Sequence, residues 1–202
     1  MRKLLLLAAL GLSAMSAPAW AQNTKTNNIL TGPYVGGNIG YTIGSADTSI
    51  GGISNDTGLD GFQGGLLAGY GFQFDPGFMS SVWSGYTGLE FGYDWSDVDG
   101  DAFGVGVEKK DSWSVTLRPG VTYGNTALGY GIIGYSRTKF EAGPDDEHLD
   151  GLVLGAGTEF GDMGPLKARV EYVYTNYEDT DIGGANFDAH DNTIKLGGVL
   201  HF

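Results

Sequence analysis

The last twelve residues of the chain, Asp191 to Phe202, read DNTIKLGGVLHF and decide the fold. Every second position from Ile194 to the terminal Phe202 is apolar or glycine, whereas the alternate positions include Lys195 and His201. Because successive side chains of a β-strand point to opposite faces, this stretch predicts a strand with one apolar face and one polar face.

Seven further segments alternate in the same way. They span residues 34–45, 62–74, 83–96, 112–123, 126–140, 149–160 and 166–178. Their connections are alternately long, at 46–60, 97–111, 141–148 and 179–190, and short, at 75–82, 124–125 and 161–164. An even number of such segments with alternating short turns and long loops is typical of transmembrane barrels. The sequence therefore predicts an all-β fold, an eight-stranded antiparallel up-and-down transmembrane β-barrel over residues 33–202.

A soluble up-and-down barrel is the structural alternative, since it has the same periodicity with its apolar face inside. Three features favour the membrane form. Glycines gather on the polar face, the chain ends on an aromatic strand, and aromatic residues crowd the segment ends on the apolar face, as in interfacial girdles. These aromatic residues are Phe72, Phe74, Trp95, Trp113, Phe160, Tyr174 and Phe202.

The N-terminus predicts export. Arg2 and Lys3 precede an apolar stretch at 4–12, and Ala19-Trp20-Ala21 is an A-x-A cleavage site, so residues 1–21 are expected to be a signal peptide cleaved near Ala21. An uncleaved anchor helix is disfavoured because the apolar stretch is too short to span a bilayer. Residues 22–32 would then form a short periplasmic lead-in.

Composition excludes several classes. The 202 residues suit one domain, and 36 glycines without a G-X-Y period exclude collagen. With no cysteine there is no disulfide, thiolate metal site or lipid-anchored cysteine. Beyond the leader, nine basic residues stand against 24 acidic ones, a net charge of −15. This balance argues against nucleic-acid or anionic-lipid binding through a basic patch.

Two local features set the expected strand register. Gly124-Asn125 has the form of a two-residue hairpin turn, which would place Val121 opposite Leu128. The same parity would direct three side chains of the fifth segment to the lipid, namely Leu128, Tyr130 and Ile132. Pro119 falls on the apolar parity of its own segment and predicts a bulge or a weak ladder position.

With the polar face inward, the lumen is expected to hold charges of both signs, including Asp94 and Arg137. Symmetric hairpins would pair Glu90 with Arg118 on the inner face and Trp95 with Trp113 on the outer face. A three-residue turn would pair Glu159 with Lys167. Buried charges must be paired or solvated, and an eight-stranded barrel is only wide enough for its own side chains. We therefore predict a closed, salt-bridged lumen network of Glu90, Arg118, Glu159, Lys167, Arg169, Glu171 and Lys195. The alternative is a narrow gated pore for small solutes whose ion pairs switch partners.

From about Gly32 to Phe202 the chain resembles small bacterial outer-membrane β-barrel proteins of the OmpA-type and opacity-porin-like families. The first strand, GPYVGGNIGY at residues 32–41, matches theirs. The resemblance implies that the last strand closes the barrel against the first and carries an insertion signal for the barrel-assembly machinery, with residues Ile194, Leu196, Leu200 and Phe202. It also implies a place in the cell outer membrane among lipid and lipopolysaccharide, and a structural or surface role in envelope integrity or adhesion. Since the chain stops at the last barrel residue, no peptidoglycan-binding domain is expected.

An enzymatic role is disfavoured. Some small outer-membrane barrels modify lipid A, and a deacylase-like site would need a histidine and a serine close together on one strand with a carboxylate. None of His148, His190 and His201 has a serine two positions on. We expect no catalysis, no cofactor and no metal site.

The acidic run Asp97 to Asp101 resembles the start of a calcium loop, but its glycine is misplaced and Glu108 reaches the twelfth position only in a forced register. The acidic loops are expected to be solvated and to face a host or surface ligand. A divalent ion bridging them to lipopolysaccharide phosphates is a further hypothesis.

Overall fold

The structure is a computed structural model that describes residues 29–50, 53–77, 82–102, 105–124, 126–142, 145–161, 164–178, 180–182 and 185–202. Within these ranges, side chains are described except at 46–57, 59, 97–108, 140–147 and 180–188. The predicted signal peptide and most of the predicted lead-in lie outside the described residues, so cleavage near Ala21 stays a prediction. None of the described residues belongs to a helix long and apolar enough to cross a membrane.

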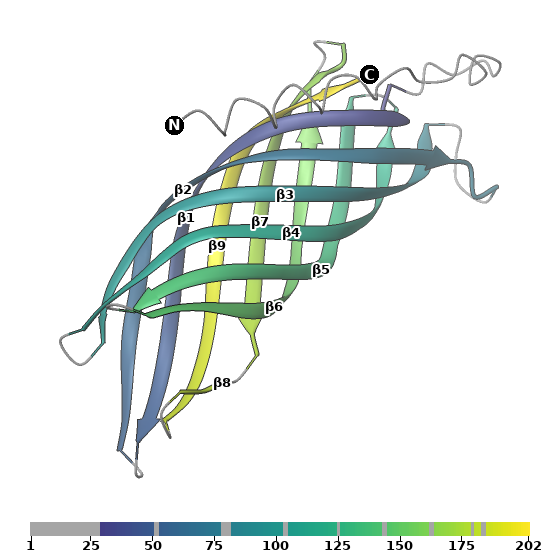
Figure 1. Ribbon diagram of the computed structural model, residues 1–202. Coiled ribbons are helices and arrows are strands. Elements are labelled where there is room, and N and C mark those ends of the chain that lie inside the picture. Colours follow the sequence, from purple (N-terminus) through teal and green to yellow (C-terminus); the bar gives the residue numbers. More distant parts are fainter. Residues whose placement is uncertain are drawn as a thin grey trace.

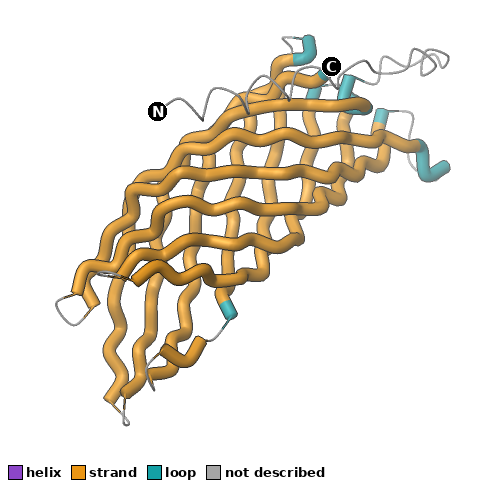
Figure 2. Tube along the Cα trace, viewed as in Figure 1, coloured by secondary structure: helices purple, strands orange, loops and turns teal. Residues whose placement is uncertain are grey.

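The described residues form one closed antiparallel sheet (Figures 1 and 2). Each strand pairs with the next as far as the seventh, the seventh pairs with the ninth, and the first also pairs with the ninth. The strands are β1 (Gly32–Ile50), β2 (Ile53–Phe74), β3 (Trp83–Ala102), β4 (Val105–Tyr123), β5 (Ala127–Ala142), β6 (Asp145–Phe160), β7 (Leu166–Tyr177), β8 (Thr180–Ile182) and β9 (Ala185–His201).

Eight strand positions surround the lumen, because the short β8 pairs only with β9 and extends the position of β7 beyond the end of that strand. Closure is made by β1 and β9, whose ladder runs from Tyr34 opposite His201 to Ser49 opposite Asn186. The predicted eight-stranded antiparallel barrel, closed by its first and last strands, is confirmed.

The wall and the lumen separate by parity as predicted. Outward apolar side chains are well exposed, for example Ile39 at 68% and Phe62 at 72%. The inward residues Thr42 and Gln63 are buried and hydrogen-bond to each other at 3.1 Å. A soluble barrel would have the opposite arrangement, so the apolar wall is the face that contacts lipid.

The two ends of the barrel differ (Figure 1). The C-terminus and the start of β1 lie at one end, together with the short turns, and long hairpins project from the other. Expected loops at 46–60, 97–111 and 141–148 are mostly continuous ladder; β1 and β2, for instance, stay paired up to Ile50 opposite Ile53. Crossing a bilayer needs only about 9–11 residues of strand, so these hairpins reach well beyond the membrane. The prediction that the strands end at residues 45, 96 and 140 and give way to long loops is therefore wrong at this end. The ladder continues because it satisfies its own backbone groups there.

In the fifth strand the residues that face the lumen are those predicted to face the lipid. Tyr123 pairs with Ala127, so three residues rather than two connect β4 and β5, and Gly124 adopts a φ of 54°. One extra residue in the turn reverses the parity of the strand that follows it. Three side chains expected on the lipid face are consequently buried in the lumen: Leu128 at 1%, Tyr130 at 5% and Ile132 at 4% exposure.

Two other predicted registers are wrong by two residues, which leaves the parity intact. Glu90 lies opposite Thr116, and Tyr93, not Trp95, lies opposite Trp113. At the β6–β7 turn Glu159 lies opposite Arg169 instead of Lys167. A register shift of β3 on β4 between Trp95 and Val98 accounts for part of the difference, because the hairpin is not symmetric about its tip.

Pro119 does occupy a weak position, as predicted. The β4–β5 ladder pairs Leu117 with Ile133, skips Arg118 and Pro119, and resumes at Gly120 opposite Tyr130 without a change of register. Proline has no amide hydrogen to donate, so the ladder is interrupted where the ring sits.

Inward glycines make room for tyrosine rings. A Cβ atom added to Gly69 would lie 2.4 Å from Cζ of Tyr34, and one added to Gly157 would lie 2.8 Å from the ring of Tyr130. Both separations are too short for a real contact. The predicted role of glycine on the polar face, to leave space in a narrow lumen, is confirmed at these positions.

We expect Leu196→Arg to reduce the amount of folded protein in the outer membrane strongly. Leu196 lies on the lipid-facing wall with 52% of its surface exposed, and an arginine near the middle of such a wall costs about 2–4 kcal/mol. Asp99→Asn, in the hairpin extension of β3, is the control and should leave the level unchanged. The readout is the heat-modifiable band in outer-membrane fractions; equal levels of the two variants would contradict the assigned outer face.

Candidate functional site: the charged lumen

The centre of the lumen holds five charged side chains from four strands. Glu90 comes from β3, Arg118 from β4, Glu159 from β6, and Arg169 and Glu171 from β7. Each is no more than 5% exposed. They all belong to the predicted lumen set, and inward parity is what brings them together.

The five side chains form one continuous chain of charge-assisted hydrogen bonds. Arg118 donates through Nη2 to Oε1 of Glu90 at 2.5 Å and through Nη1 to Glu171. Arg169 donates through Nη1 to Oε2 of Glu90 at 2.7 Å and through Nη2 to Oε1 of Glu159 at 2.5 Å. Glu90 therefore joins the two guanidinium groups, and removal of either guanidinium would take a cationic partner away from two buried carboxylates.

One histidine and two tyrosines also contact this network, and none of the three was in the predicted lumen set. Nε2 of His201 lies 2.8 Å from Oε2 of Glu159, and the hydroxyl of Tyr130 donates to Oε1 of Glu171 at 2.6 Å. The ring centroid of Tyr34 lies 5.7 Å from Cζ of Arg169, within cation–π range. His201 was recognisable from its inward parity, whereas Tyr130 was missed because the preceding turn was given one residue too few.

Four other residues predicted to lie in the lumen are not part of this central network. Lys167 is buried and donates to the carbonyl oxygen of Gly161 at 2.5 Å, next to the β6–β7 turn. Lys195 and Asp94 form their own ion pair at 2.7 Å. Arg137, expected inside, lies on the outer surface, where its side chain is 46% exposed.

A second buried cluster lies closer to the hairpin end. Nζ of Lys109 is 2.6 Å from Oδ2 of Asp191, which also accepts a hydrogen bond of 2.8 Å from the hydroxyl of Tyr177. The sequence prediction had placed Lys109 in an external loop. A register shift between Lys109 and Ser112 directs Lys109 into the lumen. The residue pattern of this segment did not predict the shift.

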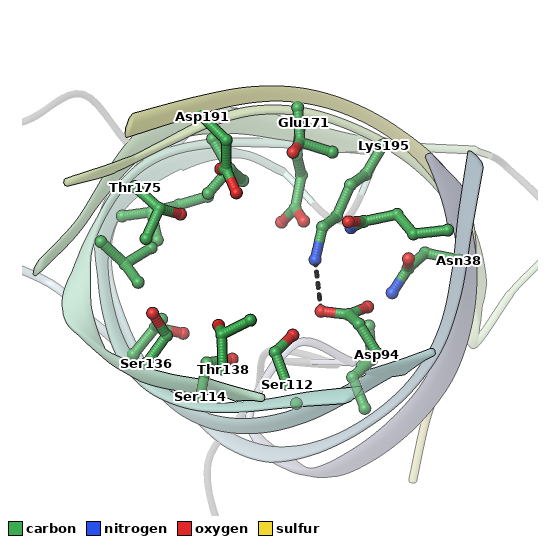
Figure 3. Close-up of a pocket in the computed structure, with 18 of the residues that line it drawn as sticks. Asn38, Asp94, Ser112, Ser114, Ser136, Thr138, Glu171, Thr175, Asp191 and Lys195 are labelled. Atoms are coloured by element: carbon green, nitrogen blue, oxygen red, sulfur yellow. Dashed lines mark hydrogen bonds and ion pairs between the residues drawn. The ribbon is translucent and has the colours of Figure 1, made fainter. Parts of the chain in front are cut away.

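Between the two clusters the lumen encloses a polar cavity of about 50 Å³ (Figure 3). Figure 3 shows Ser112, Ser136, Thr138 and Thr175 around it, with the Lys195–Asp94 pair crossing one side. A buried water occupies roughly 10–15 Å³ on this scale, so the cavity has room for a few waters. Within the described part of the chain, no group of three or more acidic, histidine or cysteine side chains could hold a metal ion.

An apolar layer lies at the turn end of the lumen, formed by Leu30, Tyr86, Leu128 and Tyr130 among others. Leu30, from the segment predicted to be a lead-in, is only 1% exposed. Its neighbour Thr31 accepts a hydrogen bond of 3.0 Å from the backbone amide of Gln73. The chain just before β1 is therefore part of the packing of the barrel.

Sequence comparison agrees with this architecture. The family described as "Outer membrane protein beta-barrel domain" matches residues 7–202. The 25 kDa outer-membrane immunogenic protein of Brucella abortus biovar 1 (strain 9-941) is 33% identical over 171 residues, which cover 81% of this chain and 71% of that protein. The 22 kDa outer membrane protein of Rhizobium leguminosarum bv. viciae is 30% identical over 168 residues, which cover 78% and 75%.

Solved structures agree on the fold alone. Neisserial surface protein A (NspA) superposes with a TM-score of 0.53 at 14% identity, covering 85% of this chain and 98% of that one. The outer membrane protein OprG of Pseudomonas aeruginosa gives a TM-score of 0.50 at 14% identity, covering 85% and 97%. With a closed barrel, a lipid-facing apolar wall and a family match over nearly its whole length, the chain belongs to the outer membrane protein β-barrel domain family.

Proposed function

We propose that this protein is a structural surface protein of the outer membrane whose lumen is closed by its charge network. The observation that carries the proposal is the sharing of Glu90 by two guanidinium groups, which links β3, β4, β6 and β7 across the interior. Paired buried charges hold side chains in fixed positions, since breaking a pair would leave an uncompensated charge buried in the protein. The apolar layer around Leu30 adds a second barrier at the turn end.

The proposed role is in envelope integrity or adhesion, through the projecting hairpins. They extend beyond the part of the barrel that lipid can cover, and most acidic residues of the chain lie in them. Relatives in Brucella are named immunogenic outer-membrane proteins, which supports exposure of the corresponding region here. The hairpins would meet a host or surface ligand, and the wall would meet lipid and lipopolysaccharide.

We also propose that the barrel-assembly machinery reads the last strand. Its outward row, Ile194, Leu196, Leu200 and Phe202, lies on the lipid-facing side of the closing strand. Such a row is accessible before closure, when β9 has not yet paired with β1.

A catalytic role is not part of the proposal. The histidines lie in three different settings: His148 is exposed, His190 packs near Tyr174 with ring centroids 6.0 Å apart, and His201 is buried against Glu159. The named relatives are outer-membrane or immunogenic proteins and not enzymes.

A narrow pore is the second candidate, and the polar cavity beside the Lys195–Asp94 pair is the observation that favours it. We expect the refolded wild-type protein to be electrically silent in a planar bilayer, because the network blocks the lumen between the cavity and the turn end. Arg118→Ala should show conductance steps, since it removes the link between Glu90 and Glu171. Heat-modifiable mobility confirms folding of both proteins. Stable wild-type conductance that changes with Arg118→Ala would instead establish the pore.

The charge network should also stabilise the folded barrel. Arg169→Met leaves Glu90 and Glu159 buried without this guanidinium, so we expect the free energy of unfolding in phosphatidylcholine vesicles to fall by about 3–5 kcal/mol. Arg137→Met removes an arginine from an exposed pair with Asp150, at 3.7 Å, and should cost about 1 kcal/mol or less. Urea titration followed by tryptophan fluorescence measures both; similar losses would contradict a special role of the buried network.

Orientation can be tested with inserted epitope tags. A tag after Ala142, at the end of β5, should be labelled by antibody on intact cells, because the hairpins are proposed to face outward. A tag after Gly124, in a short turn, should be labelled only after the outer membrane is permeabilised. The reverse pattern would overturn the proposed orientation.

A further inference from the structure

The positive charges of the barrel are divided unevenly between its two faces. Among the described residues, the lumen contains Lys109, Arg118, Lys167, Arg169 and Lys195. Lys110 is half-buried at the register shift of β4. The outer surface presents Arg137 and Lys139 on β5, and His148 lies directly opposite Lys139 on β6. Despite a strongly acidic composition, the outer wall thus brings two cations and a histidine together on β5 and β6.

This sector lies at the rim of the lipid-facing wall. A tyrosine–carboxylate or tyrosine–amide pair recurs on the outside of each long hairpin. Tyr41 donates to Asp60 at 2.6 Å, and Tyr172 donates to Asn192 at 2.5 Å. The other two pairs are Tyr93 with Asp111 and Tyr135 with Asp150.

In all four pairs the acceptor lies two residues from the tyrosine's register partner, toward the hairpin tip. Carboxylates on the lipid face are tolerated only near the interface, and tyrosine prefers the headgroup level. The four pairs therefore mark where the hydrocarbon ends.

A hollow of about 450 Å³ opens in the wall at this level, between β3 and β6. Its lining includes Tyr93, Trp113, Arg137, Lys139 and His148. Nearer the membrane centre the wall is apolar, with Val115, Leu117 and Ile133 exposed. The hollow thus combines aromatic rings and cations at the boundary between hydrocarbon and headgroups.

Two carboxylates accompany the cations. Asp111 also lines the hollow and is hydrogen-bonded by Tyr93. Asp150 is hydrogen-bonded by Tyr135 and lies 3.7 Å from Nε of Arg137. This Arg137 contact is longer than a hydrogen bond and half exposed, so it is a weak pair. A phosphate oxygen would compete well for this guanidinium, because phosphate and guanidinium match in charge and geometry.

We infer that this hollow binds a phosphate group on the headgroup of an outer-leaflet glycolipid, namely a lipopolysaccharide phosphate. The acyl chains would lie along the apolar wall below, and Arg137 and Lys139 would contact the phosphate. The net charge of the chain argued against such a site, but interactions between exposed charges are screened beyond about 10 Å. The lining of the hollow itself carries two cations, Arg137 and Lys139, against one carboxylate, Asp111. The inference rests on the proposed outward orientation of the hairpins, which the tag insertions test separately, and not on closure of the lumen.

The test is binding of fluorescent lipopolysaccharide to the refolded full chain in neutral detergent micelles. Two cations near an anionic surface contribute enough for at least a tenfold effect, so Arg137→Gln/Lys139→Gln should weaken binding about tenfold or more. Enzymatically dephosphorylated lipopolysaccharide should bind the wild-type protein as weakly as intact lipopolysaccharide binds the double glutamine variant. The swap Arg137→Lys/Lys139→Arg is the matched control, because it keeps both charges and should retain most of the affinity.

Three results would overturn the inference. These are equal affinity of the wild type and the double glutamine variant, equal affinity for the phosphorylated and dephosphorylated forms, and displacement of the lipid by millimolar inorganic phosphate, which would indicate a soluble-anion site. Heat-modifiable mobility reports folding of each variant. If the double variant does not fold, Lys139→Gln alone should still weaken binding severalfold, and unchanged affinity would count against the site.

Discussion

Closure of the backbone ladder between β1 and β9 is the constraint on which the rest of this molecule depends. In hydrocarbon no water is present to satisfy a free amide or carbonyl group, so a sheet can cross a membrane only as a closed ring. The backbones of β1 and β9 lie too close together for a side chain at some positions. A Cβ added to Gly36 would lie 2.5 Å from the carbonyl oxygen of Gly198. With eight strand positions the ring is narrow, and its interior is only wide enough for side chains.

The narrow interior in turn determines the chemistry of the lumen. Charged groups on the inner face are beyond the reach of bulk water, and each requires a partner. Glu90 accepts from both Arg118 and Arg169, and Glu159 accepts from Arg169 and faces His201. The charged side chains of the inner face thus form a connected network, whereas the side chains of the outer face contact lipid and headgroups. Lumen and wall carry different proposed functions because the inner surface contacts other side chains of the protein and the outer surface contacts lipid.

Parity was the strongest predictor of the site. Glu90, Glu159, Arg169 and Glu171 were expected in the lumen from alternation alone, and all four are there. Exact pairing was not predictable, since opposite partners shifted by two residues in the β3–β4 and β6–β7 hairpins and by one residue in the β4–β5 hairpin. The contact of Arg118 with Glu90 nevertheless forms, because long side chains reach diagonal neighbours across a ladder.

The sequence by itself determined the class of fold, the lipid-facing residues of seven strands and the presence of charges of both signs inside the barrel. These follow from a period of two residues, which is local and needs no knowledge of distant contacts. Only the tertiary structure decided the orientation of β5, the inward turn of Lys109 and the outward position of Arg137. One residue more or less in a turn or bulge reverses every side chain beyond it, and that choice depends on how neighbouring strands fit together, as when Gly157 leaves space for Tyr130.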